Sequence, residues 1–136
     1  MKIYANSTTS IDALSSEDKL NLIRRIANKD RWVFITVQDY YAKRPSTKYW
    51  YAKFLSVTDT EHIKFLGIGE PYISNILNDP EHYRRADEQA FCSKYLQSLV
   101  QGNIPQYSFK LSAITIEQPL KILTFDEITS ILESVL

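Results

Sequence analysis

The chain of 136 residues is poor in cysteine and glycine, with one of the first and three of the second. The single thiol, Cys92, cannot form an internal disulfide or supply a thiolate cluster for zinc. Gly67 and Gly69 form a close pair, but no third glycine follows at the spacing of a phosphate loop, and no Lys-Ser/Thr follows either. They therefore lack the pattern of a phosphate-binding loop, and we interpret them as a turn that ends a strand.

Long apolar runs are also absent. No segment approaches the ~20 apolar residues that cross a bilayer. The first ten residues, MKIYANSTTS, contain no apolar stretch of the kind found in secretory signals. With one cysteine, these features lead us to expect a cytoplasmic protein without a membrane span.

Recognisable catalytic patterns are missing as well. The two histidines, His62 and His82, stand in no metal-binding spacing. Cys92 lies ten residues after His82 on an expected helix, about 15 Å along its axis, and we interpret it as a small buried apolar residue. The chain's adjacent carboxylates point roughly 100° apart on a helix, which does not make an acid–base pair. We expect no catalytic residue, metal or cofactor. An unrecognised active site is an alternative, and it would need a histidine to meet a carboxylate or Cys92 in a pocket.

The apolar pattern predicts one α+β domain over residues 1–136. We expect an antiparallel, meander-containing sheet of about five strands packed with three to four helices, in the order βα-βββ-αα-ββ-α. The expected strands cover 1–5, 31–38, 48–57, 62–68, 106–117 and 120–123. The expected helices begin at 15 or 16, 71, 80 and 125; the third runs to about 101, and Thr124 and Glu127 form a capping box before the last.

The charges balance to zero overall but are unevenly distributed. Residues 19–53 contain nine basic and two acidic residues, whereas residues 54–136 contain six basic and eleven acidic ones. A neutral chain can therefore carry one basic and one acidic surface.

A basic aromatic segment, defined here as residues 40–53, is the most distinctive stretch of the sequence. In the expected hairpin, Trp50 faces the core and the tyrosines on either side of it face away. Such a surface can stack bases and neutralise phosphates, or it can anchor a protein partner. Alternatively, its tyrosines pack under the long helix and its lysines are simply solvated. The candidate interaction residues are Tyr40, Tyr41, Lys43, Arg44, Lys48, Tyr49, Tyr51 and Lys53.

An acidic group on the expected long helix provides a second candidate surface, formed by Asp79, Glu81, Asp87 and Glu88. In type, although not by motif, the chain resembles the small single-domain accessory proteins of phages and mobile elements, which dock onto host proteins. The main hypothesis is a non-enzymatic protein-binding module of that kind, for example an inhibitor whose acidic surface covers the basic groove of an immune nuclease. Nucleic-acid binding through the basic aromatic segment is the alternative, and a second copy of the chain is a further candidate partner.

Overall fold

A computed structural model describes residues 14–39, 46–69, 71–82 and 86–136. The strand expected at 1–5 and the candidates Tyr40, Tyr41, Lys43 and Arg44 lie outside these ranges. The elements are α2 (Ser16–Ile26), β2 (Trp32–Asp39), β3 (Ser46–Phe54), β4 (His62–Gly69), α3 (Pro71–Asn78), the 3₁₀ turn η1 (Pro80–His82), α4 (Ala86–Gln101), β5 (Gln106–Lys110), the 3₁₀ turn η2 (Leu111–Ala113), β6 (Ile114–Ile116), β7 (Ile122–Leu123) and α5 (Phe125–Val135). The α+β fold expected from the sequence is confirmed.

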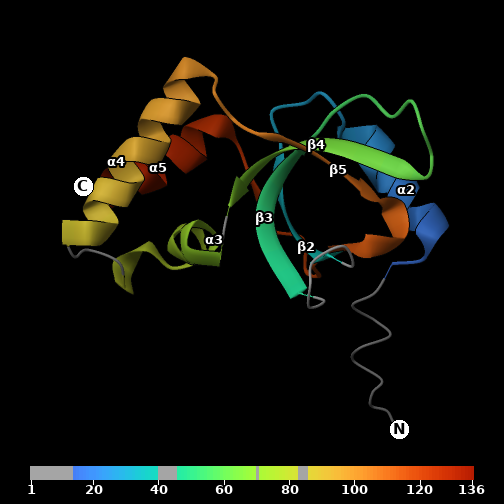
Figure 1. Cartoon of the computed structure of the whole chain (residues 1–136), viewed down its shortest axis with the longest axis horizontal. Helices are drawn as coiled ribbons and strands as arrows, with labels where there is room; N and C mark the ends of the chain where they lie inside the picture. Colours follow the sequence, from blue (N-terminus) through green and yellow to red (C-terminus); the bar gives the residue numbers. More distant parts are fainter. Residues whose placement is uncertain (1–13, 40–45, 70, 83–85) are drawn as a thin grey trace, which may run out of the picture.

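One antiparallel sheet contains all the described strands, in the order β5-β4-β3-β2-β6, with β7 also paired to β2. The expected meander is β2-β3-β4. Strands β5 and β6 are separated only by η2, yet they lie at opposite edges of the sheet, so the sheet must curl to bring these edges together (Figure 1). The single strand expected over 106–117 is therefore wrong, because the chain leaves one edge at Leu111 and joins the other at Ile114.

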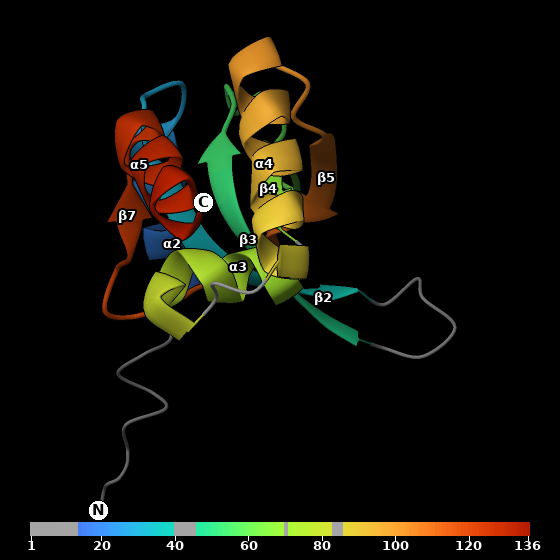
Figure 2. The same cartoon turned by 90° about the vertical axis from the view of Figure 1, so that its left-hand side faces the viewer.

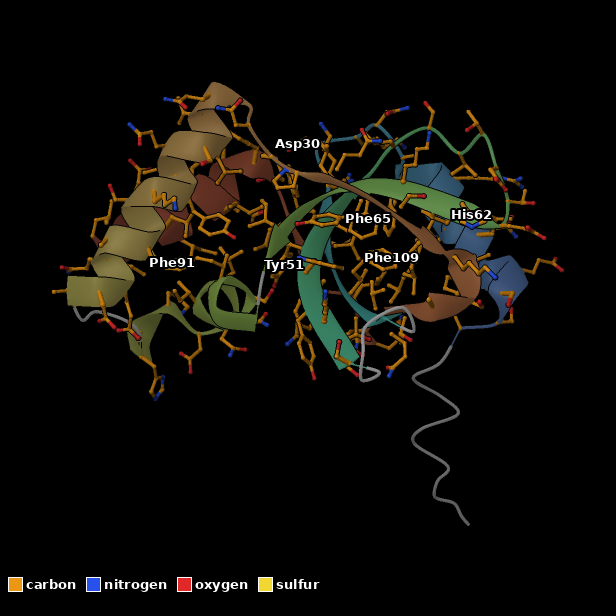
Figure 3. The ribbon with its side chains drawn as sticks, viewed as in Figure 1. Asp30, Tyr51, His62, Phe65, Phe91 and Phe109 are labelled. Carbon is orange, nitrogen blue, oxygen red and sulfur yellow. The ribbon has the colours of Figure 1, made fainter. Side chains whose placement is uncertain are left out.

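Helices cover both faces of the sheet: α2 lies on one face, and α3, α4 and α5 lie on the other (Figures 1 and 2). The alternation of side chains along β3 divides the core in the expected way. Trp50, Ala52 and Phe54 pack on the α2 side, whereas Tyr51 packs with the three other helices. Phe65 and Phe109 lie inside the curl of the sheet (Figure 3).

Helix starts follow their capping residues in two cases. The Ser15 side chain accepts a hydrogen bond from the Asp18 N–H at the start of α2 (3.2 Å). The expected capping box of Thr124 and Glu127 begins α5. Together these contacts satisfy N–H groups that the first turn of a helix leaves unpaired.

The helix expected to begin at Pro80 is wrong at its N-terminal end. Residues Pro80–His82 form a 3₁₀ turn, and the described part of α4 begins at Ala86. The Asp79 carboxylate lies 2.7 Å from Nδ1 of His82, so it binds a ring nitrogen where a helix cap would accept backbone N–H groups.

The glycine pair does not form a turn, which corrects our interpretation of the sequence. Gly67 and Gly69 are both residues of β4, and each leaves room for an aromatic ring on the α2 side of the sheet. A Cβ at Gly67 would lie 3.0 Å from the ring of Tyr107, and a Cβ at Gly69 would collide with Trp50. Glycine is required here by close packing of the sheet.

Candidate binding groove

The basic aromatic segment is only partly available as a surface. Tyr51 is 2% exposed. It lies between β3 and α3, where its hydroxyl donates a hydrogen bond to Oδ1 of Asn78 (2.8 Å) (Figure 3). Burial raises the pKa of Tyr51 to about 12. Tyr51 therefore belongs to the core, and its place among the candidate interaction residues is corrected.

The neighbouring residues of β3 are less enclosed. Tyr49 is 38% exposed, and its ring stacks on Phe34 of the adjacent strand with 6.3 Å between centroids. Lys48 and Lys53 are half-buried. Among the described residues of the segment, Tyr49 is thus the one aromatic side chain with substantial exposure, which leaves a small platform for stacking bases.

The burial of Tyr51 gives a testable pH dependence. The unfolded chain ionises tyrosine near pH 10, whereas folded Tyr51 ionises near pH 12. We expect the stabilisation associated with neutral Tyr51 to be complete below pH 10 and to be lost as pH rises towards 12. A tyrosinate absorbance titration should show a late-ionising component that falls by one tyrosine in Tyr51→Phe. If the wild type and Tyr51→Phe give the same late phase, the Tyr51 hydroxyl is not buried.

The acidic group is also divided by the fold. Asp79, Glu81 and Asp87 are exposed, but Glu88 is 2% exposed on the inner side of α4. Cys92, one helical turn further on, is fully buried, and its pKa is raised by burial and then by the charge of Glu88. Glu88 is therefore not a surface residue, which corrects its place in the expected acidic surface.

Both histidines meet a carboxylate, but at the surface. Nδ1 of His62 lies 3.6 Å from Asp59, and Nδ1 of His82 lies 2.7 Å from Asp79. The hydrogen bond to Asp79 raises the pKa of His82. All four side chains are about half exposed or more, and no group of three metal-ligating side chains occurs in the described ranges. Both pairs are therefore open to solvent, whereas the enzyme alternative places a histidine in a pocket.

A groove lies between α4 and the sheet. Its volume is about 230 Å³. The helix contributes a stripe at helical spacing, and β4 and the segment 103–105 form the opposite wall. The lining residues are Gly67, Ile68, Phe91, Lys94, Tyr95, Ser98, Leu99, Asn103, Ile104 and Pro105.

Aromatic contacts hold this groove in shape. Phe91 and Tyr95 stack with 5.4 Å between ring centroids, and the Tyr95 hydroxyl donates to the Gly69 carbonyl (3.0 Å). Phe91, Tyr95 and Leu99 stand at helical spacing in the sequence, but this spacing does not distinguish a groove wall from solid core. Only the position of β4 opposite α4 separates these two cases.

The groove lies beside a strand with an unpaired edge. In the described part of the chain, β5 pairs with β4 alone (Figure 2). Backbone hydrogen bonds join Gly67 to Pro105 and Glu61 to Leu111, and the antiparallel ladder between them alternates. Because of this alternation, the backbone N–H and C=O groups of Tyr107 and Phe109 point towards β4. Those of Gln106, Ser108 and Lys110 point outwards. These three residues are exposed, so their N–H and C=O groups can pair with another strand.

Comparisons of this chain with protein-family models, with curated proteins and with solved structures each found no match. In the described residues, no helix combines the length and apolar character needed to cross a membrane.

Proposed function

We propose that this chain is a protein-binding module in which β5 pairs with an extended segment of the partner. The observation that carries this proposal is the position of the unpaired β5 edge, with Ser108 at its centre, beside the groove under α4. Main-chain hydrogen bonds along such an edge provide affinity, and a neighbouring pocket that accepts alternate side chains provides specificity. Each net hydrogen bond contributes about 1 kcal/mol.

The groove is suited to hold one apolar side chain of that segment. Phe91, Tyr95 and Ile104 provide its apolar walls, and about 230 Å³ is enough room for one large side chain. Residues of an added strand that face the α4 side would point towards this groove at the Pro105 end of β5. Inhibition of a host immune nuclease by a phage or mobile-element protein would be one case of protein binding, and it stays a prediction from the sequence.

A substitution at Ser108 tests this function. Proline at position 108 removes the N–H that points outwards and leaves the backbone hydrogen bonds to β4 in place. An edge strand such as β5 tolerates proline at such a position. Ser108→Thr is the matched control, because threonine keeps the N–H and favours a strand. We expect a partner protein from native extract to be retained by the wild type and by Ser108→Thr, and to be at least about tenfold depleted on Ser108→Pro.

Two results would contradict the proposal: retention of no protein by the wild type, or equal retention by Ser108→Pro. Circular dichroism of the variants separates loss of binding from loss of fold.

A further inference from the structure

The surface beside the β5 edge carries positive charge. Register places His62 opposite Lys110 and Lys64 opposite Ser108, and alternation turns these four side chains to the α4 side of the sheet. The side chains of Lys64 and Lys110 are exposed. Lys94 of α4 adds an exposed cation at the groove itself.

These cations have few acidic neighbours. In the described ranges, no salt bridge engages Lys64, Lys94 or Lys110. Asp59 pairs with His62 at the start of β4, and Glu61, the residue before the strand, lines a second hollow together with Lys110 but forms no salt bridge with it. Positive charge therefore exceeds negative charge between the groove and Lys110, and Lys64 and Lys94 have no acidic partner among the described residues.

We propose that the segment paired with β5 is acidic, with carboxylates on alternate residues and one aromatic or large aliphatic side chain for the groove. This inference rests on the proposed strand pairing. A residue of the added strand beside Lys110 would face Lys110 directly, one beside Ser108 would lie in line with Lys64 across β5, and one beside Gln106 would face the groove. An opposite charge facing Lys110 on the neighbouring strand contributes about 0.2–1 kcal/mol. The expected pattern is two carboxylates two residues apart, followed or preceded at the same interval by the apolar residue.

The same charges argue against a second copy of this chain as the occupant. Two β5 edges related by a two-fold axis would place Lys110 of each copy on adjoining strands, with Lys64 of each copy one strand behind. Like charges on neighbouring strands destabilise pairing, and lysine on an edge strand is a common device against self-association.

Synthetic peptides test the inference directly. The acidic probe has the sequence TETETFT, and its reversed form TFTETET covers the other strand direction. Each has a neutral counterpart with glutamine and a basic one with lysine. Titration by fluorescence anisotropy at about 50 mM salt should show at least about tenfold tighter binding of an acidic probe than of its neutral counterpart. The double variant Lys64→Glu/Lys110→Glu should reverse the preference to the basic probe. Ser108→Pro should abolish binding of every probe.

The outcomes separate the two proposals. Equal binding of acidic, neutral and basic probes, sensitive to Ser108→Pro, overturns the acidic occupant and leaves strand pairing intact. Binding that is unaffected by Ser108→Pro overturns strand pairing too. No binding of any acidic probe up to about 1 mM overturns the acidic occupant. If light scattering shows a dimer that Ser108→Pro dissociates, the edge belongs to a second copy of the chain. If oligothymidylate binds in a salt-sensitive way and competes with the acidic probe, the surface belongs to nucleic acid. Either result overturns the acidic occupant.

Discussion

Gly69→Ala is expected to lower the free energy of unfolding by about 3 kcal/mol or more. The added Cβ would collide with Cδ1 of Trp50 and would lie 2.6 Å from the carbonyl oxygen of Tyr49. The Trp50 ring cannot move aside easily, because it is 5% exposed and stacks on Tyr107 with 4.7 Å between centroids. The Tyr49 carbonyl is also held, since it accepts a hydrogen bond from Ser74 (2.9 Å). Urea unfolding followed by tryptophan fluorescence measures the loss.

Gly102→Ala is the matched control for this substitution. Both changes restrict the unfolded chain in the same way. A Cβ at Gly102 would meet no atom within 4 Å, and the cost arises only from its φ of 75°. That conformation costs alanine about 1 kcal/mol. If Gly69→Ala is no more destabilising than Gly102→Ala, Trp50 does not pack closely against Gly69.

Lys19→Met is expected to destabilise the fold by about 3 kcal/mol. Lys19 is 9% exposed, and its Nζ donates to the carbonyl oxygens of Leu111 (2.9 Å) and Ile114 (2.6 Å). These carbonyls belong to η2 and the start of β6, where the chain crosses between the two edges of the sheet. Methionine has a similar length but no donor, so the Ile114 carbonyl would lose its bond to Nζ in a buried place, and the Leu111 carbonyl would keep only the bond from the Ile114 N–H. Thermal and urea unfolding measure the effect.

Lys29→Met serves as the control, because Lys29 is exposed one residue after the turn that follows α2. A change within about 0.5 kcal/mol is expected there. Equal stabilities for the two lysine variants would show that Lys19 does not hold this crossing. Lys19 is one of the nine basic residues of 19–53, and its burial lowers its pKa.

The local elements of this protein follow from short stretches of sequence. Ser15 and Thr124 start their helices, and alternation along β3 assigns Trp50 and Tyr51 to opposite faces. The candidate surfaces were less predictable. Tyr51 and Glu88 are polar residues of a type common on surfaces, yet both are buried. Tyr51 is covered by α3, and Glu88 lies on the inner side of α4. The residues next to them in the sequence do not indicate this burial.

The sequence by itself determined the α+β class, the antiparallel meander, the caps of α2 and α5 and the separation of acidic from basic regions along the chain, because periodicity and capping are local properties. The tertiary structure alone decided that β5 and β6 lie at opposite edges, that Lys19 joins them, and that an unpaired edge adjoins a groove under α4. These features depend on contacts between residues up to 95 positions apart, which are set by the packing of whole elements.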